Sequence, residues 1–378
     1  MELGEFIQYL IDEGYIDAIR TNTVAQFGLP NQPFLGASIL PEVEQPLNMY
    51  KEQRVRFTSV IASPGGRYSP VQLRQGGQMF ASFLVELGES DIGRNFDGRD
   101  YDALMDLLRQ TNGSNATDMP LERAASLFGS WTDTAINFAL MQLNEKQRWE
   151  AIVGASTTSK GDNGLVQTIN FYDPPNHRSA AGSVWSNDAN DPWPEIQAKV
   201  QVLRDKGYVP TMIVTSSKVM QILKGNLNIA RRTGAAFVTK TADNNVNVQM
   251  QDMVTNERIN QLASYEQMPP FTIYDTRYRD IDGGYKRYLP EDALVIVCQN
   301  GPDQEVVNNL DPEDTRFIPS PLGYFGIGTP QGEPSPGRVI RLKARTDDKP
   351  YHVAAKGWQT GGPVLTDPEA VAAITGIS

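Results

Sequence analysis

The chain has 378 residues, 40% of them hydrophobic and 21% charged, which is typical of a folded protein of two or three domains. Its formal net charge of −11 excludes tight nucleic-acid binding as its main role, because the 34 lysines and arginines are scattered and form no basic face. A single cysteine excludes an internal disulfide, and no stretch approaches the ~18 apolar residues of a membrane span, so we expect no membrane partner.

The N-terminal quarter predicts pieces that need a surface to pack on. An amphipathic helix is expected over residues 3–19, with an apolar side made of Phe6, Ile7, Leu10 and Ile11. A proline-punctuated segment over 29–43 follows and predicts an extended arm. Residues 52–88 predict two strands joined by a long loop. An isolated hairpin of that length is marginal in water, so we expect it to lie on another surface.

The clearest local element is a long helix predicted over residues 121–153. This stretch lacks proline, and its apolar residues recur at spacings of three and four. Pro120 suits the first turn of a helix and Gly154 suits its end. Some 30 residues make a rod of roughly 45 Å, so the pattern predicts a spine on which other elements are carried.

The second half predicts a compact α/β unit over about 190–325. A helix begins at Asp191-Pro192, and Ser216 or Ser217 can cap a shorter one. Further elements are strands over 209–214, 271–274 and 293–298, a hairpin over 278–288 that turns at 282–284, and strands over 338–342 and 351–355. This order lacks the regular alternation of a doubly wound enzyme.

The sequence contains no convincing catalytic motif. The two histidines, His177 and His352, lie far apart and lack the spacing of paired metal ligands. Residues 326–332 have the wrong glycine spacing for a phosphate-binding loop, so we predict a glycine-proline surface loop there. We therefore expect no enzyme activity, no metal and no cofactor.

The other chemistry-bearing residues fit structural roles better. Three carboxylates could in principle hold a cation, but Asp191 is better placed as a helix cap; the three are Asp188, Asp191 and Glu195. Trp131 lies on the apolar stripe of the long helix, which favours core packing over ligand stacking. Cys298 ends an apolar run, so we expect it to be buried.

Four stretches, in the same order along the chain, carry a resemblance to one family. They are Phe34-Leu35-Gly36 through Glu42, Gly207-Tyr208-Val209-Pro210 through Val214, Tyr274-Asp275 through Leu294, and Tyr351 through Val371. In these stretches the chain resembles the phage lambda major head protein family. The resemblance implies an α+β fold, the Hong Kong ninety-seven fold of tailed-bacteriophage capsids.

That resemblance also implies a domain organisation. The expected parts are an N-terminal arm over 1–50, an extended loop over 51–90, a peripheral domain over 91–189 and 326–378 with the spine helix at about 120–153, and an axial domain over 190–325. Residues 90–120 and 225–265 contain no part of the resemblance.

The function implied is that of a major capsid protein. Subunits would form the hexamers and pentamers of an icosahedral head that encloses double-stranded DNA without sequence-specific binding. Portal, scaffolding and decoration proteins would be its partners. It would be assembled in the host bacterial cytoplasm and reside in the virion. No lysine lies between Lys51 and Lys146, so we expect no covalent cross-link from the extended loop.

The expected subunit contacts follow from the loop and the arm. An arginine-rich loop on an acidic chain leads us to predict ion pairs with an adjacent subunit, and the arm is expected to reach under another. The candidate interface residues are Arg54, Arg56, Arg67, Arg74, Glu86, Glu89, Phe34 and Leu35. Two alternatives stay open: an encapsulin-like compartment shell, which would enclose enzyme cargo, and a soluble enzyme whose site one sequence does not reveal.

Overall fold

The fold was obtained as a computed structural model in which part of the chain is described. The described residues are 3–13, 19–21, 28–29, 32–45, 49–57, 78–112, 121–160, 166–234, 236–240, 246–250, 253–280, 283–308, 315–345 and 351–377. The chain divides into two compact units, which we describe separately. Unit 1 comprises Met1–Tyr50, Glu86–Lys146 and Phe325–Pro363; unit 2 comprises Lys51–Val85, Gln147–Tyr324 and Val364–Ser378.

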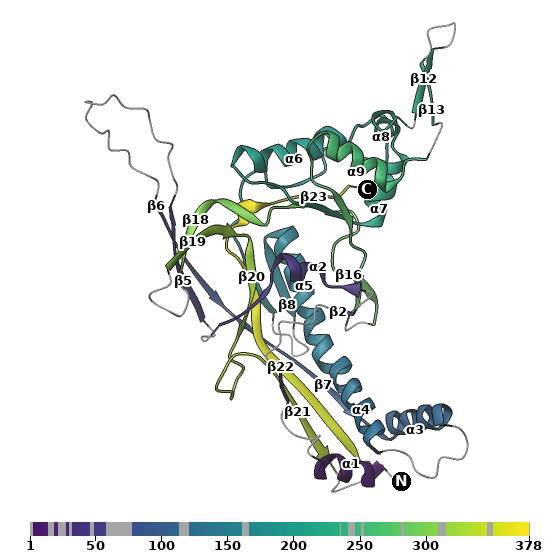
Figure 1. Cartoon of the computed structure of the whole chain (residues 1–378), viewed down its shortest axis with the longest axis vertical. Helices are drawn as coiled ribbons and strands as arrows, with labels where there is room; N and C mark the ends of the chain where they lie inside the picture. The colour runs from purple at the N-terminus through teal and green to yellow at the C-terminus, as the bar shows by residue number, and fades with distance from the viewer. Residues whose placement is uncertain are drawn as a thin grey trace, which may run out of the picture. The chain divides into compact units, whose positions relative to one another are not determined.

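Unit 1 is built on a mixed sheet. Its strands follow the order β1-β21-β22-β20-β4, and β7 pairs with the other edge of β22. The strands are β1 (Ile19–Thr21), β4 (Glu42–Glu44), β7 (Gly88–Phe96), β20 (Gly323–Gly328), β21 (Arg338–Arg345) and β22 (His352–Leu365). In Figure 1, β7, β22 and β21 run side by side.

Helices accompany this sheet, and the last of them continues into unit 2. They are α1 (Leu3–Asp12), α2 (Leu35–Ile39), α3 (Gly98–Asn112) and α4 (Leu121–Thr132), followed without a break by a π-helical turn, η1 (Asp133–Asn137), and α5 (Phe138–Gly154). The shared core contains Phe6, Phe96 and Phe128, whose rings meet edge to face. Trp131 stacks on Phe128, as its place on the stripe predicts.

Unit 2 contains a five-stranded sheet of order β10-β23-β17-β11-β14. Its strands are β10 (Arg178–Ala180), β11 (Met212–Thr215), β14 (Phe271–Ile273), β17 (Leu294–Val297) and β23 (Val371–Thr375). All four residues of β17 are buried, as expected for an apolar central strand. Helices α6 (Trp193–Asp205), α7 (Ser217–Gly225), α8 (Leu227–Arg232) and α9 (Asn256–Tyr265) belong to the same unit.

The predicted loop strands lie in a second sheet of unit 2, of order β19-β18-β5-β6. They are β5 (Met49–Phe57) and β6 (Gln78–Glu86). The other two strands of this sheet are β18 (Asn300–Asn308) and β19 (Thr315–Pro321). The two expected strands are therefore present, and β18 pairs with β5. Three hairpins complete the unit: β8 (Ser156–Lys160) with β9 (Val166–Asn170), β12 (Ala236–Lys240) with β13 (Val246–Met250), and β15 (Arg277–Arg279) with β16 (Tyr285–Arg287). A short pair, β2 (Gly28–Leu29) with β3 (Gln32–Pro33), lies in unit 1.

Most of the locally encoded elements are confirmed. The long helix predicted over 121–153 is present as α4, η1 and α5. Ser216 caps α7, since its hydroxyl accepts a hydrogen bond from the Val219 amide at 3.1 Å. Gly283 takes a positive φ of 81° in the expected hairpin turn. Among the described helices, none combines the length and hydrophobicity that a membrane crossing requires.

Three predictions were wrong. The segment over 29–43 is not extended throughout, because Leu35–Ile39 form the helix α2. The N-terminal helix ends at Asp12, and Ile19 lies in β1, because its backbone pairs with Ile340 of β21. Residues 326–328 are not a surface loop but the end of the buried strand β20. Glycine is needed where β20 and β22 approach: a Cβ at Gly361 would lie 3.0 Å from the Gly326 carbonyl oxygen.

Candidate functional site

A group of buried polar side chains ties β4, within the predicted arm, to the rest of unit 1. We call it the arm network, and it consists of Glu42 on β4, Asn144 on α5, Arg338 on β21 and Gln359 on β22. Their side chains are buried, with no residue more than 8% exposed. Arg338 forms an ion pair with Glu42 and donates from Nε to Gln359 Oε1 at 2.8 Å. Asn144 donates to Glu42 at 3.2 Å and accepts from Gln359. The charges are thus paired and hydrogen-bonded, as burial requires.

A second contact fixes the residues that precede β4. The Gly36 amide donates to Glu145 Oε1 at 2.7 Å, and a Cβ at this position would lie 2.8 Å from both carboxylate oxygens. Only glycine lets the carboxylate approach this closely. Phe34 stacks on Phe138 with ring centroids 5.5 Å apart. Residues 34–44 are therefore held by their own subunit's helix and sheet.

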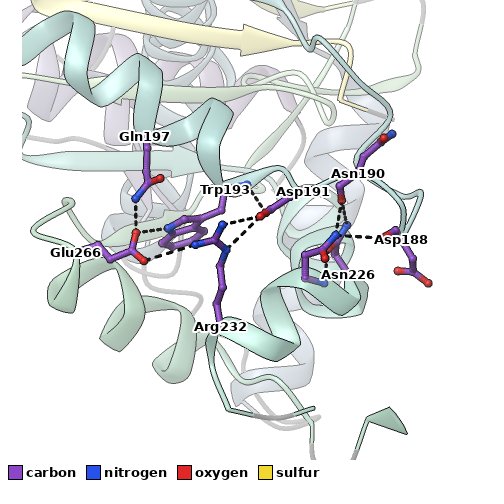
Figure 2. A network of polar contacts seen from close by, with 9 residues as sticks. Asp188, Asn190, Asp191, Trp193, Gln197, Asn226, Arg232 and Glu266 are labelled. Atoms are coloured by element: carbon purple, nitrogen blue, oxygen red, sulfur yellow. Dashed lines mark hydrogen bonds and ion pairs between the residues drawn. The ribbon is translucent and has the colours of Figure 1, made fainter. Parts of the chain in front are cut away.

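Unit 2 has a polar network of its own, centred on Arg232 at the end of α8 (Figure 2). Arg232 binds Asp191 Oδ2 through Nε at 3.2 Å and Nη2 at 2.6 Å, and its Nη1 lies 3.9 Å from Glu266 Oε1. Glu266 accepts hydrogen bonds from the Trp193 indole and from Gln197. These contacts join the start of α6, the end of α8 and the end of α9.

The neighbouring loop is held by amides. Asn226 donates to the carbonyl oxygens of Trp185 and Asn190, both at 3.0 Å, and accepts from the Asn228 amide at 2.9 Å to cap α8. Asp188 accepts from the Leu227 amide at 3.2 Å. In Figure 2, Asn226 lies beside Asn190 and Asp188.

The predicted acidic cluster does not form a shared site. Asp191 accepts from the Trp193 amide at 3.1 Å, which supports its interpretation as a helix-start residue. Glu195 instead accepts from the Gly182 amide at 2.8 Å and the Trp185 indole at 2.9 Å. Across the ranges that the structure describes, no group of three His, Cys, Asp or Glu residues could hold a metal ion.

Two buried titratable groups lie beside the five-stranded sheet. His177 is fully buried, and its Nδ1 lies 2.9 Å from the Val371 carbonyl oxygen. Burial lowers the pKa of His177, and the hydrogen bond to Val371 opposes that shift. Cys298 is also buried, as predicted, and burial raises its pKa to about 12. Both side chains are thus neutral at pH 7, and neither is set up for nucleophilic or acid–base chemistry.

The predicted interface residues lie in several elements. Arg54 and Arg56 are on β5, where Arg56 is in register with Glu305 of β18. Glu86 ends β6, and Glu89 is exposed on β7. Leu35 begins α2, and Phe34 is only 3% exposed, so its ring is used within the subunit. Arg67 and Arg74 lie outside the described residues.

The arm network was missed at the sequence level. Its hydrogen-bonded and ion-paired members are separated by 21 to 296 positions along the chain, so no local spacing connects them. A weak signal existed in Glu42, which lies within the arm motif. It is a charged residue between apolar neighbours in a segment that was expected to pack on another surface.

Comparison with known proteins identifies the family. A model of the family described as phage major capsid protein E matches residues 106–307, slightly more than half of the chain. The chain belongs to that family. The resemblance to phage head proteins stated above is thus confirmed, and the capsid protein is a structural component of the virion. No protein of curated function matches its sequence significantly.

Comparison with solved structures found chains of similar structure to this capsid protein. A protein assigned as a prophage capsid protein of Escherichia coli CFT073 aligns over 99% of both chains, with a TM-score of 0.57 and 13% identity. A phage-related protein from Bordetella bronchiseptica RB50 aligns over 91% of this chain and 92% of its own, with a TM-score of 0.46 and 10% identity. An encapsulin complex from Synechococcus elongatus PCC 7942 aligns over 97% of this chain and 94% of its own, with a TM-score of 0.40 and 9% identity. The first of these confirms the α+β capsid fold.

Proposed function

We propose that this capsid protein assembles into the hexamers and pentamers of an icosahedral phage head that encloses double-stranded DNA. The single observation that carries the proposal is the match to the phage major capsid protein E family. Portal, scaffolding and decoration proteins are its proposed partners, and the host bacterial cytoplasm is the proposed place of assembly. The net charge of −11 suits a wall that must not trap the packed genome.

The proposed role of each part of the chain follows the expected domains. Residues 1–50 serve as the arm, 51–90 as the extended loop, 91–189 with 326–378 as the peripheral domain, and 190–325 as the axial domain. The fixation of residues 34–44 by the arm network supports a refinement of this scheme. Phe34 to Glu44 pack on their own chain, as do Phe6 and Leu10 of α1, so the proposed contact with another subunit falls to other residues of the arm.

The loop is proposed to contact an adjacent subunit through its arginines. Arg54, Arg56, Arg67 and Arg74 would pair with carboxylates of a neighbour, each exposed pair contributing at most about 1 kcal/mol. Charge-reversed Arg54→Glu/Arg56→Glu protein should then form fewer shells than the wild type, with the largest deficit at low salt, where charges are least screened. Normal assembly of that variant from low to high salt would contradict the contact.

The experiment that tests the function is negative-stain electron microscopy combined with light scattering. The recombinant protein is examined alone and with the products of its neighbouring genes. Closed shells, or rings of five and six subunits, are expected. A monomer or dimer that persists in the presence of candidate scaffolding chains would refute the proposal. Shells that co-purify with an enzyme and lack a portal would favour the encapsulin alternative.

A further inference from the structure

The β15–β16 hairpin of unit 2 presents an arginine-rich face. Arg277 and Arg279 occupy alternate positions on β15 and are both exposed. The register places Arg277 opposite Arg287, and Arg279 opposite Tyr285. Tyr285 is 74% exposed. One face of the hairpin therefore carries three arginines and a tyrosine, the residue types that are enriched at protein interfaces.

The other cations of the hairpin are already neutralised within it. Lys286 forms an ion pair with Asp280, and Arg287 forms one with Asp275. Arg277 interacts electrostatically with Glu291, but that carboxylate pairs with Lys218 at 3.0 Å. Among the residues that the structure describes, Arg277 and Arg279 take part in no ion pair. Two positive charges on one strand face are thus left for a partner.

An acidic strand edge in unit 1 has the complementary pattern. β7 pairs with β22 along one side and lies at the margin of its sheet. Ile92 and Phe96 pack into the core cluster, so Glu89 and Asp91, at positions of opposite parity, face away from it. Both carboxylates are exposed, and within the described ranges neither forms an ion pair. This edge therefore offers two negative charges to a partner.

The arginine pair and the carboxylate pair have opposite charges and the same spacing along their strands. Residues two apart on a strand are separated by roughly 6.5–7 Å, and this spacing applies equally to Arg277 with Arg279 and to Glu89 with Asp91. We propose that the β15–β16 hairpin of one subunit docks on the β7 edge of a second copy, with the two arginines facing the two carboxylates. The inference rests on the proposed self-assembly and names one of its contacts. The contact is heterologous, so it can be repeated around a ring.

Nucleic acid is the less favoured occupant of this face. Binding to a phosphate backbone draws on an extended basic surface that releases many counterions. The hairpin offers two unpaired cations, and its remaining basic residues are bound to carboxylates. A second copy of the chain instead supplies a matching acidic edge. We therefore assign the face to contact between subunits.

Charge reversal with rescue tests the contact in the full-length protein, expressed with its genomic neighbours. Arg277→Glu/Arg279→Glu and Glu89→Arg/Asp91→Arg should each lower the yield of shells by on the order of tenfold, as two attractions become repulsions. The protein that carries all four changes should recover to within about threefold of the wild type, since the pairs are restored in reverse. Shell yield is measured on sucrose gradients, and folding of the unassembled fraction by circular dichroism.

A matched control comes from the same unit. Lys224→Glu/Arg231→Glu, on α7 and α8, makes the same change in charge away from the hairpin and should leave the yield within about twofold of the wild type. The proposed contact would be overturned if the protein with all four substitutions failed to recover its shell yield, or if Arg277→Glu/Arg279→Glu assembled normally. So would normal shells of that variant that package less DNA, which would assign the face to nucleic acid. If the wild type forms no shells, the proposed function itself fails.

Discussion

The crossing of β22 over the spine helix gives a sharp test of the packing. A Cβ on Gly357 would overlap Cγ2 of Ile136 in the π-helical turn and lie 3.5 Å from Cδ1 of Leu140. Overpacking a core by one methyl group costs about 1–3 kcal/mol. Gly357→Ala should therefore lower the free energy of unfolding of the unassembled subunit by that amount, as measured by urea titration with circular dichroism.

A control lies one strand away. Gly93 on β7 is in register with Lys356, next to Gly357, and a Cβ there would have no neighbour closer than 3.9 Å. Gly93→Ala should be neutral or should stabilise by about 0.4–1 kcal/mol, because it restricts the unfolded chain. The two variants make the same chemical change in the same sheet, so a difference between them reports packing alone.

The double mutant completes the test. Ile136→Ala alone should destabilise by about 2–5 kcal/mol through the cavity it leaves. Combined with Gly357→Ala, the new methyl group enters that cavity, so the two effects should fall short of additivity by at least about 1 kcal/mol. Equal stability of Gly357→Ala and Gly93→Ala, or full additivity with Ile136→Ala, would refute the close contact between β22 and the helix.

Three further outcomes are expected. Arg338→Met should destabilise by about 3–5 kcal/mol in urea titrations by leaving the Glu42 charge buried and unpaired, whereas Glu42→Met/Arg338→Met should recover much of the loss; equal losses would contradict a buried pair. The folded state lowers the pKa of His177 from 6.5, so the unfolded state binds the proton more readily, and the free energy of unfolding should fall as the pH drops below about 6.5. His177→Gln should reduce this pH dependence of the free energy of unfolding. An unchanged pH profile in that variant would contradict the role given to His177. Cys298, with a pKa of about 12, should resist iodoacetamide at pH 7 until urea unfolds the subunit; rapid labelling of the native protein would show that the thiol is accessible.

The sequence predicted the elements whose causes are local. The α7 helix was predicted because Ser216 is a capping residue followed by an apolar stripe, and β17 because four consecutive apolar residues suit a central strand. The β15–β16 hairpin was predicted from its glycine turn, where Gly283 has the positive φ that the turn requires.

Elements that depend on residues far apart in the sequence were not predicted. Glycine-rich β20 resembles a loop in sequence, and its burial depends on the close approach of Gly361 to Gly326. The arm network depends on partners brought together by the whole fold, as with Glu42 and Arg338. Contact between subunits was expected at the loop and the arm, whereas the β15–β16 face emerges only when ion pairing within the hairpin is known.

The pairing of β4 with β20 also affects when a subunit becomes complete. Val43 pairs with Gly326, and Glu42 pairs with Arg338, so β4 meets these two partners only after some 300 further residues have been synthesised. At ~5–20 residues per second, the ribosome takes roughly 15–60 s to supply them. Until then β4 has no strand to join. A nascent chain therefore lacks the β4–β20 pairing of the finished subunit for most of the time that its synthesis takes.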